Sequence, residues 1–505
     1  MSRRTALAAS ALLLTSVLAL ASCTGGGSPA PTAGGGEPDP DGTLTVRLAL
    51  EPTNLDIRHT AGAALEQALV DNVYQGLVTR DADNEVVGAL ASDWEISPDG
   101  LTYTFTLQDG VTFQDGTALT ANDVVTSYTA ARDDATIVNG SDLAGATSIT
   151  APDDKTVVIT LAAPNADFLF ALTGRAGLVF KTGDTADLQT TANGTGPFTV
   201  SEWNQGDSLV LARNDAYWGE KAGVAEVVLD YIPDQSAAAN AATAGDVDVV
   251  TEVDPEFRDQ IEGLGTFALQ TGQTTDKGTL AFNNARPPLN DPRVREALRS
   301  AIDHDALIEA LGGAAEPLSG PIPPLDPGYE DLSDTVSYDP ERAKELLAEA
   351  GQEDLELTLT IPSVYTSTIP TYLVSAFDDI GVTLKVDSVE FPAWLQNVYT
   401  NKDYDLSFVR HVEAHDFGNW ANPDYYFDYD NAQVQELYAQ SQASTDPQET
   451  DRLLAEAARI VAEDDAADWL FLATPITAVG TNVSDFPENS LNVRMPLAGV
   501  TVSSE

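Results

Sequence analysis

The part of the chain that decides the fold is residues 91–127, which read ASDWEISPDGLTYTFTLQDGVTFQDGTALTANDVVTS. Apolar residues alternate with threonines over residues 102–107, which is the period of a strand with one buried face. The turn signal Pro98-Asp99-Gly100 stands before that run. Further along, Thr120 with Asp123 three residues later predicts a capping box at the start of a helix. The stretch therefore predicts a β-hairpin that leads into a helix.

The same stretch resembles the signature segment of a known family, the peptide/nickel-type extracellular solute-binding proteins of ABC importers. This is solute-binding protein family 5, which includes oligopeptide- and dipeptide-binding lipoproteins. The matching features are Trp94, the DGLTYTF run, the F-x-D-G turn and the T-A-x-D-V helix start, all in register. Gln108 and Gln114 depart from the family, which usually has a basic residue and a larger ring at these positions.

Three later segments resemble further landmarks of that family. They are NGTGPF at residues 193–198, NDAYW at residues 214–218 and FNNARPPLNDPRVREALRSAIDHDALIEAL at residues 282–311. In the last segment, Asp291 is predicted to cap a helix with Pro292 in its first turn. The resemblance covers about residues 43–500.

Hydrophobic periodicity predicts the elements between these landmarks. Apolar residues four apart predict a helix over residues 63–77, and residues 198–211 form a strand-like run. Asp339 is predicted to cap a helix that ends before Gly351. A β-α-β pattern over residues 355–389 precedes another predicted strand at residues 404–409. The alternation of strands and helices predicts α/β lobes.

The resemblance implies a two-lobed, periplasmic-binding-protein-like α/β fold with a hinge and an extra small domain, and closure of the lobes around a ligand. The implied boundaries are residues 43–76, 186–283 and 473–505 for lobe I, 77–185 for the extra domain and 284–472 for lobe II.

The N-terminus predicts a lipoprotein signal peptide over residues 1–22. Arg3 and Arg4 precede an apolar stretch, and Leu20-Ala21-Ser22-Cys23 fits a lipobox whose cysteine carries lipid. A transmembrane helix is the alternative, but about fifteen apolar residues fall short of the roughly 20 that a span needs. Residues 23–42 are predicted to be a flexible tether. The twin arginines leave Sec and twin-arginine export both open.

The chain is strongly acidic, with 79 Asp and Glu against 25 Lys and Arg and a formal net charge of −54. Such a surface repels nucleic acid, which excludes phosphate-backbone binding as a function. The acids are spread along the chain, which is typical of a solvated surface adapted to salt or high solubility; attraction of cationic ligands is the other interpretation.

The densest group of polar and aromatic residues is VRHVEAHDFGNWANPDYYFDYD, residues 409–430. It begins at the predicted carboxyl end of strand 404–409, a place where α/β lobes bind ligands. We therefore place the candidate ligand site in this loop.

The resemblance implies specific roles in that loop. Asp416 matches an aspartate that pairs with a peptide amine, Arg410 matches an arginine near the peptide carboxylate, and Trp394 matches a tryptophan that lines the cavity. Glu413 replaces an aromatic contact, which could favour a basic side chain. The predicted ligand-binding residues are Asp416, Arg410, Trp394, Glu413, His415, Phe417, Trp420 and the loop residues Gly62, Ala63 and Ala64.

Each of these residues also has a structural interpretation. Asp416 could cap the loop, and Arg410 could form an ion pair with Asp403 or Asp405. Trp394 could be core, and the aromatic residues from Trp420 onward could simply pack the loop. Residues 62–64 could be a flexible loop without contact to ligand.

Catalytic motifs are absent from the sequence. The four histidines are His59, His304, His411 and His415, and there is no G-x-S-x-G or H-E-x-x-H run. His411 and His415 are four apart, which suits a metal only on a helix, and the local sequence does not favour one. We predict no enzyme activity, no metal and no cofactor.

The sequence therefore predicts a lipid-anchored binding protein on the outer face of a bacterial cytoplasmic membrane, a monomer that captures short peptides and delivers them to an ABC permease. A nickel chelate or an oligosaccharide is the alternative ligand. A secreted peptidase or other hydrolase is the alternative from another class.

Overall fold

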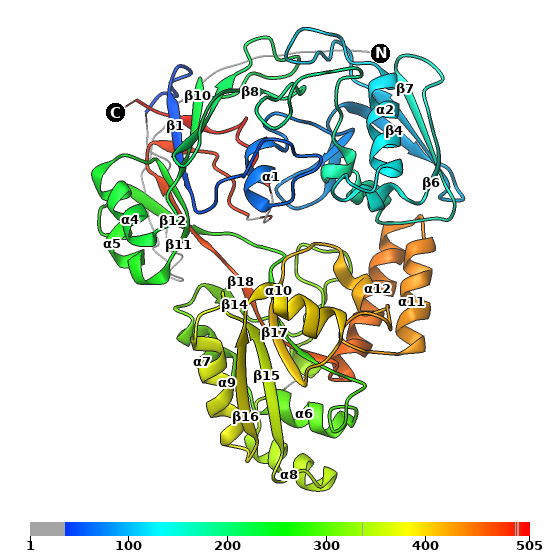
Figure 1. The fold of residues 1–505 in the computed structure, drawn as a ribbon, viewed down its shortest axis with the longest axis vertical. Helices are drawn as coiled ribbons and strands as arrows, with labels where there is room; N and C mark the ends of the chain where they lie inside the picture. The colour runs from blue at the N-terminus through cyan, green and yellow to red at the C-terminus, as the bar shows by residue number, and fades with distance from the viewer. Residues whose placement is uncertain (1–35, 336, 490, 492–493, 505) are drawn as a thin grey trace, which may run out of the picture. The chain divides into compact units, whose positions relative to one another are not determined.

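The computed structural model describes residues 36–335, 337–489, 491 and 494–504. Cys23, the signal peptide and most of the predicted tether lie outside the described residues. Within the described part, two β-sheets with helices around them form the main body of the chain, and a smaller sheet forms the extra domain (Figure 1). No described helix is both long and apolar enough to cross a membrane.

The first sheet belongs to lobe I and contains seven described strands in the order β12-β19-β11-β1-β10-β9-β8. β1 runs parallel to both β10 and β11, and the other pairs are antiparallel. The elements of this lobe are β1 (Thr43–Leu48), α1 (Ala63–Leu69), β8 (Phe198–Asn204), β9 (Ser208–Arg213), β10 (Glu226–Tyr231), α4 (Gln235–Ala244), β11 (Val249–Val253), η3 (Pro255–Phe257), α5 (Arg258–Glu262), β12 (Phe267–Thr271), β19 (Ile476–Gly480), β20 (Val483–Ser484) and β21 (Thr501–Val502).

The extra domain is built on the stretch that opened the sequence. Strands β4 and β5 form an antiparallel hairpin, and Thr120 and Asp123 make the capping box of α2, with Asp123 Oδ2 accepting the Thr120 N–H at 2.9 Å. Both predictions are confirmed. The elements are β2 (Val78–Arg80), β3 (Val86–Gly88), β4 (Ala91–Ile96), β5 (Thr102–Leu107), α2 (Ala121–Asp133), η1 (Gly140–Leu143), β6 (Ala146–Thr150), β7 (Thr156–Leu161), α3 (Phe168–Ala171) and η2 (Arg175–Gly177).

The second sheet belongs to lobe II and contains six described strands in the order β14-β18-β13-β17-β15-β16. Its elements are β13 (Lys277–Phe282), α6 (Pro292–Ser300), α7 (His304–Ala310), β14 (Ala315–Glu316), η4 (Ser333–Thr335), α8 (Pro340–Ala350), β15 (Glu356–Pro362), α9 (Thr368–Asp378), β16 (Thr383–Val389), α10 (Phe391–Trp394), the π-helical turn η5 (Leu395–Thr400), β17 (Leu406–His411), η6 (Asp416–Asn419), α11 (Ala432–Ala443), α12 (Pro447–Glu463) and β18 (Ala467–Ala473).

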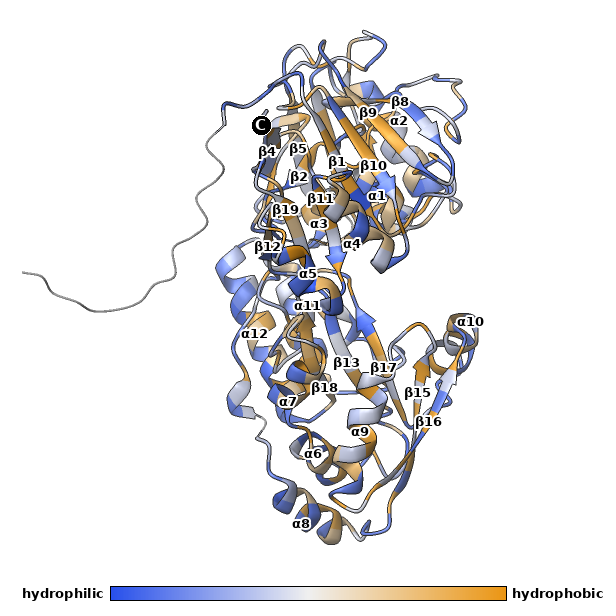
Figure 2. Cartoon of the chain, turned by 90° about the vertical axis from the view of Figure 1, so that its left-hand side faces the viewer, coloured by the Kyte–Doolittle hydropathy of each residue, from blue (hydrophilic) through white to orange (hydrophobic). Residues whose placement is uncertain are grey.

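Hydrophobic side chains fill the space between sheets and helices. All six residues of β13 and all seven of β18 are buried, as expected for central strands with both faces covered. Helix α8 alternates hydrophobic and hydrophilic residues along its length (Figure 2), and Ala343, Leu346 and Leu347 are its buried positions.

The helix termini follow the predicted capping signals. Asp291 and Asp339 accept hydrogen bonds from the backbone N–H groups of Arg293 at 3.0 Å and Arg342 at 2.9 Å. Gly351 ends α8 at φ 68°, a left-handed conformation in which glycine carries no Cβ penalty.

Three predictions about elements are corrected. The helix expected over residues 63–77 ends at Leu69, because Val70 is extended and Asp71 has φ 65°. The single run at residues 198–211 is two strands, β8 and β9, joined by a turn in which Gly206 has φ 83°. Residues 277–282, assigned to lobe I, form β13 and pair with β17 and β18 of the second sheet. Periodicity could not show that pairing, because it depends on strands more than 100 residues away.

Candidate ligand-binding site

The candidate loop follows the carboxyl end of β17. The sequence predicted this strand at residues 404–409, two residues before its observed position at Leu406–His411. β17 lies between β13 and β15 in the second sheet. Its last residue, His411, is opposite Lys277, the first residue of β13. The chain then turns through His415, which has φ 55°, into η6. This register places the loop beside the start of β13.

Asp416 already has a cationic partner within the protein. Lys277 Nζ lies 3.2 Å from Asp416 Oδ1 and also donates to the carbonyl oxygens of Thr275 at 3.1 Å and Glu413 at 3.0 Å. These three contacts use the three donors of an ammonium group. Burial raises the pKa of Asp416, and Lys277 acts in the opposite direction. The expected role of Asp416 as the partner of a ligand amine stays a prediction, but its carboxylate is not free in this structure.

Arg410 also has an internal partner, although not one of those considered from the sequence. Its guanidinium pairs with Asp276, with Nε 2.9 Å from Asp276 Oδ1. Asp403 and Asp405 instead bind Arg286, each at 3.0 Å, so the alternative partners proposed for Arg410 were wrong. The Asp276 side chain is 1% exposed and that of Arg410 is 41% exposed, so only one member of the pair faces solvent.

The predicted aromatic contacts are mostly packed into the protein. Trp394 is buried and donates its indole N–H to Ser407 Oγ at 2.9 Å. Trp420 is buried and stacks on Phe427 with ring centroids 4.0 Å apart. Phe417 is buried as well. These contacts support the packing interpretation, and contact with a ligand stays a prediction.

His415 connects the loop to the extra domain. Its Nδ1 lies 2.9 Å from Asp167 Oδ1, and its ring stacks on Phe170 with centroids 3.6 Å apart. Asp167 also accepts a hydrogen bond from Gln442 of α11 at 2.7 Å. The backbone N–H of His415 donates to Asp326 Oδ2 at 2.7 Å. Asp167 therefore tethers the extra domain to two segments of lobe II.

One group of metal-ligand residue types lies in the loop. Donor atoms of His411, Glu413 and Asp416 all lie within 4.8 Å of one another. Burial, followed by the charge of Lys277, lowers the pKa of His411 to about 4, so the imidazole is neutral near pH 7. The ammonium of Lys277 is bound to Asp416, and its positive charge opposes a cation at the same carboxylate.

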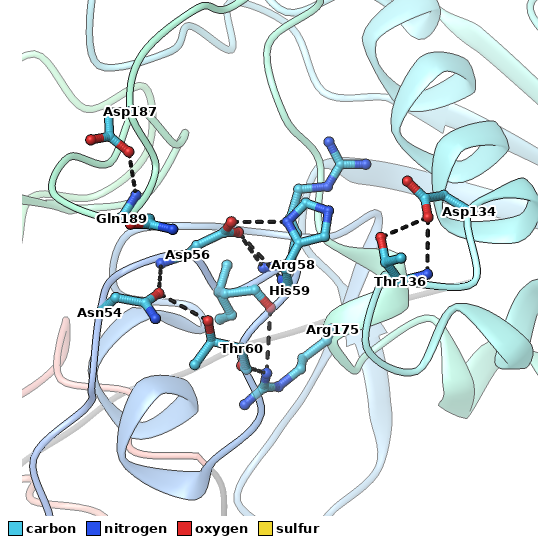
Figure 3. Close-up of polar contacts among 11 residues, drawn as sticks. Asn54, Asp56, Arg58, His59, Thr60, Asp134, Thr136, Arg175, Asp187 and Gln189 are labelled. Carbon is cyan, nitrogen blue, oxygen red and sulfur yellow. Dashed lines mark hydrogen bonds and ion pairs between the residues drawn. The ribbon is translucent and has the colours of Figure 1, made fainter.

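Residues 62–64 lie at the start of α1, next to a loop with many internal hydrogen bonds (Figure 3). Asp56 Oδ2 lies 2.9 Å from Nδ1 of His59, and Asp56 Oδ1 accepts the backbone N–H of Arg58 at 3.1 Å. Buried Arg175 donates to the carbonyl oxygens of Thr60 and Gly62, the latter at 2.8 Å. The loop is thus held by Arg175, and contact of residues 62–64 with a ligand stays a prediction.

A cavity of about 610 Å³ opens between the extra domain and lobe II. Asp326 and His415 line it, together with the turn at residues 83–86, Phe170, residues 324–329 and the start of α12. Sequence reasoning missed Lys277, Asp276, Asp326 and Asp167. None stands in the 409–430 window, and each reaches it only through the tertiary fold.

The fold is that of the two-lobed periplasmic binding proteins, and the chain belongs to the bacterial extracellular solute-binding proteins, family 5. The model of that family matches residues 85–436. The members of this family are solute-binding proteins and not enzymes.

Two relatives illustrate the sequence similarity. A probable D,D-dipeptide-binding periplasmic protein of Escherichia coli is 26% identical over 494 residues, which cover 90% of this chain and 92% of the relative. A glutathione-binding protein of Pectobacterium atrosepticum is 32% identical over 309 residues, or 59% of each chain.

Solved structures share the fold. An ABC transporter substrate-binding protein of Listeria monocytogenes has a TM-score of 0.82 at 22% identity and covers 92% of this chain and 100% of its own. A Helicobacter pylori periplasmic binding protein in complex with the peptide STSA has a TM-score of 0.76 at 24% identity, covering 92% and 98%. The two-lobed α/β fold expected from the sequence is confirmed.

Proposed function

We propose that this protein captures short peptides outside the cytoplasmic membrane and delivers them to an ABC permease. The observation that carries the proposal is the loop after β17, which follows a central strand of lobe II and borders the cavity at the extra domain through His415. A relative named as binding a dipeptide aligns over 90% of this chain, which supports a peptide as ligand.

The same site has a second candidate ligand, a metal chelate. The donors of His411, Glu413 and Asp416 lie close together, which favours it, while the charge of Lys277 opposes it. A chelate carrying net negative charge would tolerate that lysine better than a bare cation would.

The test uses the mature protein purified from its native host. Native mass spectrometry should detect bound peptides, and calorimetry should reproduce their binding after ligand is removed by mild denaturation and refolding. Peptides should be recovered intact, since the protein is not expected to cleave them. Copurification of a metal chelate without peptide, or release of cleaved peptide, would contradict the proposal.

We further propose that the chain is anchored to the membrane through lipid on Cys23 and acts as a monomer. The lipobox and the absence of any other cysteine support the anchor. A fatty-acid probe should label the wild-type protein and not Cys23→Ala, which should remain unprocessed or be released. Labelling of Cys23→Ala would contradict the anchor and leave peptide binding untouched.

A further inference from the structure

Two carboxylates stand side by side at the candidate site and differ in what they bind. Asp416 pairs with Lys277, whose three donors are all used within the protein. Asp326 lies in the segment between β14 and α8, and both aspartates line the same small hollow beside His415 and Phe417.

Asp326 is buried and only partly bonded. Its residue is 7% exposed, and Oδ2 accepts the backbone N–H of His415 at 2.7 Å. Among the described residues, Oδ1 has no hydrogen-bond partner, and it is shielded from solvent. Burial raises the pKa of this carboxyl, whereas His415 and Lys277 act in the opposite direction. A buried carboxylate oxygen without a donor is unfavourable, so a ligand that supplies one is favoured there.

The cavity that Asp326 lines has an excess of negative charge. Asp83, Glu85, Asp326 and Asp451 line it, against one cation, Arg452. That arginine is already bound to Glu449 at 2.7 Å and Glu456 at 2.9 Å.

Two further positive charges lie close to Asp326 without lining the cavity, Lys277, which already pairs with Asp416, and Arg80. The guanidinium of Arg80 lies 5.0 Å from the ring centroid of Phe170 and donates to Asn84 at 2.8 Å. Acids therefore outnumber bases in the lining, and such a cavity concentrates cations.

We propose that Asp326, and not Asp416, binds the positive charge of the ligand, and that the 610 Å³ cavity receives an ammonium or guanidinium group. This inference rests on the proposed function. The physical reason is that a ligand cation would have to displace Lys277 from Asp416, whereas Asp326 Oδ1 has no donor to displace in the described part of the chain. Because Oδ1 is shielded, the Asp326 side chain has to turn toward the cavity when the cation binds. The cation comes either from the peptide's N-terminal amine or from a lysine or arginine side chain, which share this chemistry.

Three synthetic tetrapeptide mixtures distinguish these sources. The first has randomised uncharged side chains and a free N-terminus, the second is the same mixture N-acetylated, and the third is N-acetylated with one arginine. C-termini are the same in all three. Binding to the full mature protein is measured by calorimetry and native mass spectrometry. We expect wild-type protein to bind the first or third mixture about 10- to 100-fold more tightly than the second, as a charge-assisted hydrogen bond would give.

Variants of the protein then show which aspartate binds the ligand cation. Asp326→Asn keeps the shape of the side chain and should abolish this preference for a cation. Asp416→Asn leaves the positive charge of Lys277 uncompensated beside Asp326, so it should reduce the preference for a cation only in part. Glu220→Gln removes an exposed acid of lobe I and controls for net charge. If Asp326→Asn loses affinity for the first mixture, the cation is the N-terminal amine of the peptide. If it loses affinity for the third mixture, the cation is a basic side chain.

The experiment distinguishes failure of the Asp326 assignment from failure of the proposed function. If wild-type protein shows no preference, or Asp326→Asn retains it, or Asp416→Asn loses it entirely, the assignment to Asp326 is wrong while peptide binding stands. The wild-type comparison needs no variant, so it decides even if a variant fails to fold. Failure of all three mixtures to bind wild-type protein would overturn the proposed function and this inference with it.

Discussion

At the scale of single residues, the two charged residues expected to bind the ends of a peptide, Asp416 and Arg410, are paired within the chain. The dipeptide Asp276-Lys277 at the start of β13 supplies a carboxylate to Arg410 and an ammonium to Asp416. Arg410 and Asp416 were each expected to bind one end of a peptide, and each instead has a charged partner in the same chain. A buried pair of this kind contributes little net stability, but breaking it leaves an unpaired buried charge.

Lys277→Met should for that reason be strongly destabilising. Loss of one partner of a buried pair costs ~3–5 kcal/mol in the free energy of unfolding. The double variant Lys277→Met with Asp416→Leu removes both charges and should recover much of that loss. Urea unfolding of the two single variants, the double variant and wild-type protein measures the coupling. A double variant no more stable than Lys277→Met alone would mean that the two side chains do not interact energetically.

His411 should make stability depend on pH. Its folded-state pKa is about 4 and an unfolded histidine has a pKa of about 6.5, so between these values the unfolded state binds more protons. Stability from this group is therefore complete above about pH 6.5 and is lost as the pH falls toward 4.

The measurement compares wild-type protein with His411→Gln. Between pH 7.5 and 4.5, wild-type protein should lose about 2–3 kcal/mol more free energy of unfolding than the variant. Carboxyl groups present in both proteins cancel in this difference. A pH-independent difference would show that His411 is not held neutral by its surroundings.

At the scale of elements, α6 and α8 begin at the acidic caps that the sequence predicted, Asp291 and Asp339. Asp339 accepts the Arg342 N–H at 2.9 Å, and Pro340 occupies the first turn of α8. Asp234 and Asp446 likewise accept a backbone N–H at the starts of α4 and α12. These signals are local, because a cap needs only its own residue and the next three along the chain.

Asp339→Ala should lower the free energy of unfolding by about 1 kcal/mol, because the first turn of α8 loses its acceptor. Asp339→Asn retains a side-chain oxygen and should lose much less. Thermal or urea unfolding of both variants tests this. Equal losses in the two variants would mean that the aspartate acts through its charge and not as a cap.

At the scale of the whole molecule, two features stand out. The chain passes between the two main sheets at residues 272–276, from β12 to β13, and at residues 474–475, from β18 to β19 (Figure 1). Asp276 lies in the first of these connections, so the Arg410 pair lies next to a link between the lobes. The described surface also carries many exposed acids that have few bases to balance them.

The melting temperature should rise with sodium chloride between 0.1 and 1 M. Self-repulsion among the acids is screened as the Debye length falls from ~10 Å to ~3 Å. A variant with Asp93, Glu95, Glu202 and Glu220 changed to their amides should show a shallower rise, since all four are exposed. A flat or falling curve for wild-type protein would show that the acids are already balanced locally.

The resemblance of its sequence motifs to a known family was enough to predict the family and the two-lobed α/β fold. The hairpin and capped helix of the extra domain and the helix caps could be predicted from the residues themselves, because these features depend on neighbours along the chain. The sequence also placed the candidate loop at the end of a strand. Only the tertiary structure decided what the charged residues bind. Lys277 meets Asp416 because β13 pairs with β17 at a register that brings together residues more than 130 positions apart. The importance of Asp326 also depends on the tertiary structure. Its missing hydrogen-bond partner and its place in a cavity arise from segments that meet only when the chain has folded.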